Sequence, residues 1–137
     1  MRYTPVANQI GISYSRYFEL LHFCRQYDEW KKEANSLLGI SAIRRDGMPH
    51  GNGKSDPVAR AAERRERLIA KMSIVEGCAK AAGNGEWATA LIEHVCRRKS
   101  WKEIKELRPE ILPTSDSNTF YRRRREFFNM LNKVTDI

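Results

Sequence analysis

The stretch that decides the fold spans residues 100–134 and reads SWKEIKELRPEILPTSDSNTFYRRRREFFNMLNKV. It opens with the capping box S-x-x-E, formed by Ser100 and Glu103, in which each side chain accepts a hydrogen bond from the other residue's backbone amide. We therefore predict that a short helix starts at Trp101 and ends before a proline-bracketed turn, 108–115. The side chains of this helix predicted to face inward are Trp101, Ile104 and Leu107, and those predicted to face outward are Lys102 and Lys105.

A longer helix is predicted from about residue 116 to residue 134. When its residues are placed every 100°, one side is apolar and comprises Phe120, Phe127, Leu131 and Val134, with Phe128 on the flank. The opposite side comprises Asn118, Arg122, Arg125 and Asn129, bordered by Thr119 and Arg123. Arginine can bond to guanine, asparagine to adenine and hydroxyl groups to phosphate, so this side is a candidate DNA surface. Arg124 falls over the apolar side, where we expect it to snorkel or to pair with a carboxylate.

A short capped helix, a turn and a longer helix with a polar outer side are typical of a helix-turn-helix, whose second helix enters the major groove. The alternative interpretation is that the four arginines only solubilise the last helix. Four consecutive arginines with one glutamate nearby, Glu126, are poorly neutralised by their own helix, which favours DNA binding.

The whole chain is basic, with 137 residues, 25 lysines and arginines, 17 acidic residues and a formal net charge of +8. An excess of this size indicates an anionic partner, and nucleic acid and an anionic membrane surface both fit. No stretch approaches the roughly 18 to 20 apolar residues of a membrane span, and the first residues do not read as a secretory signal. We therefore expect a cytoplasmic protein that does not enter the membrane.

The three cysteines, Cys24, Cys78 and Cys96, are an odd number in helical segments and are predicted to be reduced core thiols. Two His-x-Cys pairs could suggest zinc, but ligands two residues apart on a helix point about 200° away from each other. We therefore expect no metal and no cofactor. The three histidines are dispersed and no nucleophile, base or carboxylate pair has a recognisable spacing, so the chain is predicted not to be an enzyme.

Upstream of this region the sequence predicts two long helices joined by a glycine-rich loop. Residues 1–12 lack periodicity and read as an arm, whereas an apolar stripe runs from about residue 15 to a helix end at Gly39. The loop 44–55 ends in Gly-Lys-Ser like a P-loop, but the first glycine of that motif is missing and no strand precedes it, so we interpret it as a solvated linker. Asp56 and the proline after it then start a second helix that reaches about residue 82.

The predicted fold is therefore all-α. Residues 1–83 form a long antiparallel helical hairpin, and residues 84–137 form a three-helix unit with the helix-turn-helix, whose first helix spans about 86–99. The first long helix carries more aromatic surface than a hairpin can cover. Part of that surface is expected to pack either on the C-terminal helices or on a second copy of the chain in a homo-oligomer; the residues concerned are Tyr14, Tyr17, Phe18, Tyr27 and Trp30.

The sequences SWKEIKEL and NTFYRRRREFFNML resemble the C-terminal helix-turn-helix of phage and prophage late-gene regulators of the RinA and ArpU type, which is similar to region 4 of sigma factors. YDEW and DGMPHGNGKSDPVARAAE look like the N-terminal half of related proteins in prophages of Gram-positive bacteria. The resemblance implies activation of phage transcription, in which the last helix reads promoter DNA. A contact with RNA polymerase is also compatible with the resemblance. Carried over by position, the residues facing DNA are Ser117, Asn118, Thr119, Tyr121, Arg122, Arg123 and Arg125.

The sequence thus predicts a sequence-specific, duplex DNA-binding transcriptional regulator, with Lys102 and Asn129 added to that set of DNA-facing residues. Two alternatives stay open. One is a DNA-packaging protein like a small terminase subunit, and the other is a helical protein-interaction module that touches no DNA. The turn 108–115 is longer than the usual helix-turn-helix connection, which leaves the angle between the two helices open.

Overall fold

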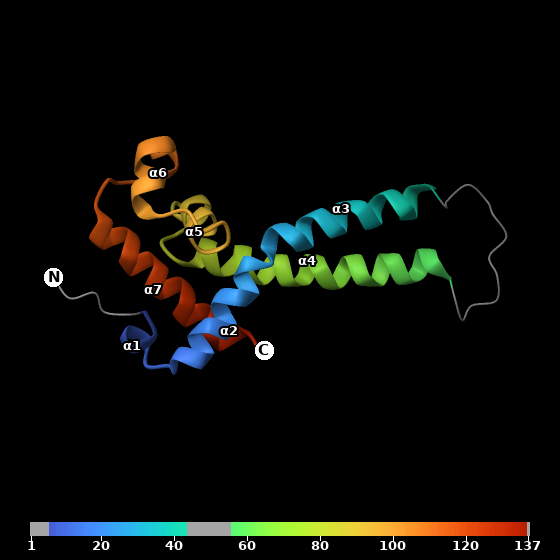
Figure 1. The fold of residues 1–137 in the computed structure, drawn as a ribbon, viewed down its shortest axis with the longest axis horizontal. Helices are drawn as coiled ribbons and strands as arrows, with labels where there is room; N and C mark the ends of the chain where they lie inside the picture. The colour runs from blue at the N-terminus through green and yellow to red at the C-terminus, as the bar shows by residue number, and fades with distance from the viewer. Residues whose placement is uncertain (1–5, 44–55, 137) are drawn as a thin grey trace. The chain divides into compact units, whose positions relative to one another are not determined.

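The structure is a computed structural model that describes residues 6–43 and 56–136, and every regular element in these ranges is helical (Figure 1). The all-α class predicted from the sequence is confirmed. In chain order the elements are α1 (Val6–Ile10), α2 (Tyr14–Arg25), α3 (Tyr27–Ile43), α4 (Pro57–Ala81), α5 (Ala88–Val95), α6 (Trp101–Leu107), a 3₁₀ turn (Pro109–Ile111) and α7 (Ser117–Val134). The glycine-rich loop 44–55, with its P-loop-like end, lies outside the described residues.

The chain divides into two compact units that differ in extent from the two regions expected from the sequence. One unit takes in the chain up to Tyr27 and from Ile74 onward, and the other is Asp28–Ser73. The sequence-based boundary at residues 83/84 assumed that each long helix belongs to one region. In the structure the last turns of α4 and the N-terminal helices pack with the C-terminal helices, so the division crosses the helices themselves.

Within the unit Asp28–Ser73, side chains of α3 and α4 contact each other at several points. Arg64 pairs with Glu33, and Nζ of Lys71 lies 5.7 Å from the ring centroid of Trp30. Residue numbers fall along α4 as they rise along α3, which is the pattern of two antiparallel helices. Asp56 starts α4 as predicted, because its Oδ1 accepts a hydrogen bond from the Val58 amide at 3.0 Å.

The single long helix expected from residue 15 to Gly39 is wrong, because the chain breaks into α2 and α3 at Gln26. The Gln26 side-chain amide donates to the carbonyl of His22 at 3.1 Å and its backbone N–H bonds to Phe23, so the last turn of α2 is closed locally. A polar residue that satisfies orphan carbonyls can end one helix and let the next begin without interrupting the apolar periodicity. The expected end at Gly39 is also wrong, since α3 continues to Ile43.

The N-terminal arm contains a helix that the sequence did not suggest. Val6 and Ala7 of α1 are buried, and α1 packs against α7 and α2. Next to it, Arg16 of α2 donates from Nε to Oδ1 of Asn132 at 2.8 Å and from Nη2 to the carbonyl of Thr135 at 2.9 Å. These contacts hold the C-terminal end of α7 against the N-terminal helices of the same unit.

The third predicted helix is shorter than expected. Residues 86–99 were predicted helical, whereas α5 spans only Ala88–Val95. Its start is preceded by Asn84 and Gly85 with φ of 59° and 87°, and Arg98 after its end has φ of 60°. A left-handed residue cannot continue a right-handed helix, so α5 must lie between Gly85 and Arg98.

Candidate nucleic-acid interface

The capping box at the start of α6 forms as predicted. The Ser100 hydroxyl accepts from the Glu103 amide at 3.1 Å, and Oε1 of Glu103 accepts from the Ser100 amide at 3.4 Å. Ile104 is buried and Trp101 is half-buried, in agreement with their inward prediction. The prediction for Leu107 is wrong: it is 74% exposed, because the helix ends there and the chain turns away.

Phe120 of α7 is the centre of an aromatic cluster that joins three helices. Its ring centroid lies 4.9 Å from that of Trp101 in α6, 5.0 Å from that of His94 in α5 and 6.1 Å from that of Trp87. Phe120 is fully buried. A large buried ring contacted from several sides fixes α6 and α7 on α5.

The long turn between α6 and α7 is anchored at its first residue. Arg108 donates from Nη1 to Oε1 of Glu93 at 3.2 Å, and Arg97 pairs with the same oxygen. Glu93 is 6% exposed, so this carboxylate is a buried acceptor shared by two guanidinium groups. After Arg108 the 3₁₀ turn Pro109–Ile111 takes up part of the extra length.

Asp116 caps the start of α7. Its Oδ1 accepts from the Asn118 amide at 3.1 Å, and its Oδ2 accepts from the Thr119 hydroxyl at 2.9 Å. The Thr119 hydroxyl, one of the predicted DNA contacts, is therefore engaged by the cap. Ser117 is half-buried, and Asn118 is exposed at the first turn of the helix.

The four consecutive arginines of α7 have different surroundings. Arg122 is exposed and Arg125 is half-buried, and neither pairs with a carboxylate in the described parts of the chain. Arg123 instead donates from Nη1 to both carboxylate oxygens of Glu126, at 2.9 and 3.1 Å. Two of the three arginines predicted to face DNA are thus unpaired, and the third is neutralised by its own helix.

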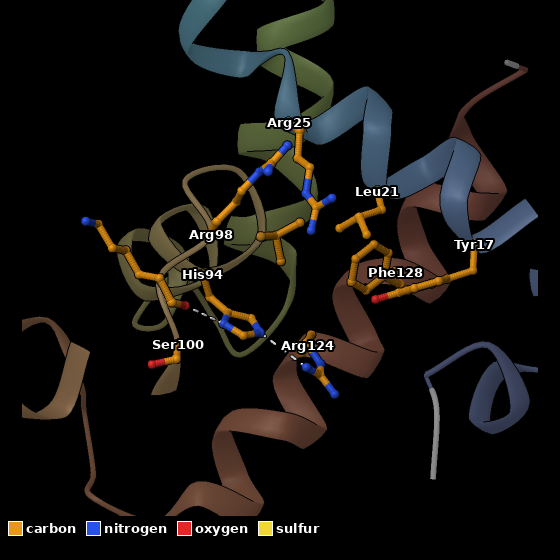
Figure 2. A pocket seen from close by; sticks show the side chains of 10 residues that line it. Tyr17, Leu21, Arg25, His94, Arg98, Ser100, Arg124 and Phe128 are labelled. Carbon is orange, nitrogen blue, oxygen red and sulfur yellow. Dashed lines mark hydrogen bonds between the residues drawn. The ribbon is translucent and has the colours of Figure 1, made fainter. Parts of the chain in front are cut away.

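Arg124 is buried and meets no carboxylate among the described residues, contrary to both outcomes expected from the sequence. It is 8% exposed, and its guanidinium carbon lies 4.6 Å from the ring centroid of Tyr121. Figure 2 shows its contact with His94, in which Nη1 of Arg124 lies 3.2 Å from Nε2. Stacking on an aromatic face is a favourable environment for guanidinium. Tyr121, another predicted DNA contact, is 38% exposed and has one ring face occupied in this way.

The remaining predicted contacts, Lys102 and Asn129, are both exposed. Asn129 also lines a pocket of about 210 Å³ with Glu126, Met130 and the end of α4. Val134, expected on the apolar side of α7, is 51% exposed because it is the last residue of the helix, where fewer residues pack against it.

Comparison with protein-family models, with curated proteins and with solved structures gave no match. The geometry of the described residues therefore carries the functional argument. In that part of the chain no helix is long and apolar enough to cross a membrane. No cluster of metal-ligating side chains occurs among the same residues.

The cysteines are buried and free, as predicted. A hydrogen bond with Cys96 and burial raise the pKa of the Cys24 thiol, and burial raises the pKa of Cys78 to about 11. Both thiols are consequently protonated at neutral pH and are poor nucleophiles and poor metal ligands.

One group of charged residues was missed by the sequence analysis. Arg25 of α2, Arg98 and Lys99 after α5, and Arg124 of α7 line a single pocket of about 310 Å³ (Figure 2). The run RRKS before the capping box was a usable signal, because three cations in a row precede a helix start. Arg25 lies far away in the sequence and only the fold brings it there.

Proposed function

We propose that this chain binds duplex DNA through the exposed side of α7. The observation that carries the proposal is the pair Arg122 and Arg125, which lie three residues apart on one helix without a carboxylate partner in the described chain. The opposite side of the helix is fixed by buried Phe120, Phe127 and Leu131. A rigidly held helix with unpaired arginines on its outer side has the chemistry that reads guanine edges and binds phosphates in a major groove.

Three further features support the proposal. Lys102 on α6 and Asn118 and Asn129 on α7 are exposed, so they are available for phosphate or base contacts. The ion pair with Glu126 removes Arg123 from the set of candidate DNA contacts, and burial removes Arg124. The interface proposed here therefore depends on Arg122 and Arg125 more than on the arginine run as a whole.

The test is a binding titration of a labelled duplex at a series of salt concentrations, with wild type, Arg122→Ala and Arg125→Ala. Each lost phosphate contact lowers the slope of log K against log salt by about 0.9, so each variant is expected to bind more weakly and with a shallower slope. Lys32→Ala, which removes one exposed positive charge from α3, is the matched control and is expected to leave the slope unchanged. Wild-type affinity and slope in both arginine variants would contradict the proposal.

We also propose that the bound DNA is a promoter and that the protein is a phage-type transcriptional regulator without catalytic activity. The support is the resemblance of residues 100–131 to late-gene regulators, together with the capped helix, turn and longer helix that these residues form. Sequencing the DNA that co-purifies with the protein from its host is expected to return a recurring motif upstream of genes. Fragments without a shared motif, combined with a ring-sized assembly in solution, would instead favour a packaging protein.

A further inference from the structure

A pocket between α2, the segment that joins α5 to α6, and α7 has an unusual charge balance. Its cationic wall is made by Arg25, Arg98, Lys99 and Arg124, and its apolar wall includes Tyr17 and Phe128 (Figure 2). The volume is about 310 Å³. No acidic side chain occurs among the residues that line it.

The cations of this pocket have no internal counter-charge. Within the described chain, none of the four pairs with a carboxylate, and Nε of Arg25 and Nε of Arg124 are buried without an acceptor. Arg124 as a whole is 8% exposed. A buried donor without an acceptor is costly, and so is a buried positive charge that no anion compensates, and an anionic ligand would reduce the cost of the uncompensated charge.

His94 does not supply the missing negative charge or acceptor. Its Nδ1 lies 2.7 Å from the carbonyl oxygen of Lys99, so Nδ1 donates and Nε2 accepts from Nη1 of Arg124. Burial lowers the pKa of His94 to about 4, which keeps the imidazole neutral. The ring therefore orients the Arg124 guanidinium and leaves its other N–H groups for a ligand.

We propose that this pocket binds the phosphate group of a small phosphorylated organic molecule. Guanidinium groups bind the oxygens of a phosphate through paired, charge-assisted hydrogen bonds, and three arginines and a lysine around one pocket favour such an oxyanion. The Tyr17 and Phe128 rings provide an apolar surface for the organic part, and the pocket volume lies at the lower end for small-molecule sites.

The pocket is distinct from the proposed DNA surface. The side chains of Arg124 and Phe128 project from the buried side of α7, whereas that of Arg122 projects from the exposed side. A phosphate of the DNA backbone could also bind this pocket, and the experiment below distinguishes it from the phosphate of a small molecule. This inference does not depend on the proposed DNA binding.

The experiment is isothermal titration of the full chain with inorganic pyrophosphate and with adenosine monophosphate, at constant ionic strength, with adenosine as the uncharged comparison. Saturable binding of the two phosphorylated probes and none of adenosine is expected. Arg25→Gln and Arg98→Gln are expected to weaken binding by at least about tenfold. Arg122→Gln, on the opposite side of α7, is the matched control and is expected to bind as wild type does.

Each result decides the inference. Binding of the probes that persists in the presence of saturating duplex supports a separate site for a free phosphorylated molecule. Displacement of pyrophosphate by duplex, with weaker DNA binding in Arg98→Gln, would assign the pocket to the DNA backbone and overturn it. Absence of probe binding up to about 10 mM in folded wild type, or an equal loss in Arg122→Gln, would also overturn it. Circular dichroism of each variant shows whether it is folded.

Discussion

The guanidinium of Arg124 in α7 donates to the imidazole of His94 in α5 across 3.2 Å. The other ring nitrogen of His94 donates to the carbonyl of Lys99 at 2.7 Å, so one neutral ring links α5, the segment before α6, and α7. Burial first, and then the positive charge of Arg124, lower the pKa of His94 to about 4. If His94 were protonated, its ring would no longer accept a hydrogen bond from Arg124, and its positive charge would repel that of Arg124.

The pH dependence of stability follows from this arrangement. His94 has its ordinary pKa of 6.5 in the unfolded chain and a pKa of about 4 in the folded one. The stability that depends on neutral His94 is therefore fully present above pH 6.5 and is lost as the pH falls toward 4. The expected loss of the free energy of unfolding is roughly 3 kcal/mol over that interval. Urea unfolding at a series of pH values measures it.

The matched variants are His94→Gln and His22→Gln. His94→Gln is expected to be less stable than wild type at pH 7 and to show a flatter profile between pH 6.5 and 4, because the titrating group is gone. His22 is exposed on α2, and its replacement is expected to keep the wild-type profile. A wild-type profile in His94→Gln would show that the ring is not the group responsible.

Replacing Glu93 by glutamine is expected to destabilise the protein by about 2 kcal/mol, because Arg97 and Arg108 then share a neutral acceptor in a buried place. Glu110→Gln is the control. Glu110 meets Arg108 at 3.6 Å on an exposed surface, and its replacement is expected to cost less than about 0.5 kcal/mol. Denaturant unfolding of both variants tests the pair. Equal stabilities of the two variants would mean that the buried carboxylate of Glu93 stabilises the protein no more than the exposed carboxylate of Glu110 does.

Gly83 ends the α4 segment with φ of 83°, and a Cβ there would lie 2.8 Å from Cδ1 of Trp87 and 2.9 Å from the Arg123 side chain. Gly83→Ala is therefore expected to cost about 1 to 3 kcal/mol. Gly77→Ala is the comparison, because Gly77 lies within α4 with open space around it and is expected to gain about 0.5 to 1 kcal/mol. Thermal melting of the two variants should shift in opposite directions.

Asp116→Ala removes both bonds that close the first turn of α7, at the Asn118 amide and the Thr119 hydroxyl. A loss of about 1 kcal/mol in the free energy of unfolding is expected. Asp116→Asn keeps an oxygen acceptor and is expected to stay within a few tenths of a kcal/mol of wild type. If the asparagine variant lost as much as the alanine variant, the charge near the helix start, rather than the cap, would be the stabilising factor.

The local signals in the sequence were sufficient for several elements. The Ser100–Glu103 spacing gave the start of α6, Asp56 followed by proline gave the start of α4, and the 100° projection gave the buried side of α7 through Phe127 and Leu131. Each depends on neighbours within one or two turns, so pattern reasoning reaches them.

The features that were not predicted from the sequence depend on tertiary contacts. The break at Gln26 keeps the apolar spacing intact, so periodicity alone joins α2 and α3 into one helix. The burial of Arg124 needs the ring of His94, which lies 30 positions earlier in the chain, and the grouping of Arg25 with Arg98 needs the packing of α2 near α5. Leu107 has the right spacing but lies at the end of α6, where it is 74% exposed.

The burial of all three cysteines gives the protein a practical property. Cys24, Cys78 and Cys96 are 0%, 4% and 6% exposed, so maleimide dyes should find almost no native attachment point in the folded chain. A single cysteine introduced at an exposed site such as Lys32 on α3 could then carry a fluorophore by itself, without first deleting the native ones. Fluorescence of such a labelled protein could then test the proposed DNA binding while the buried residues stay unaltered.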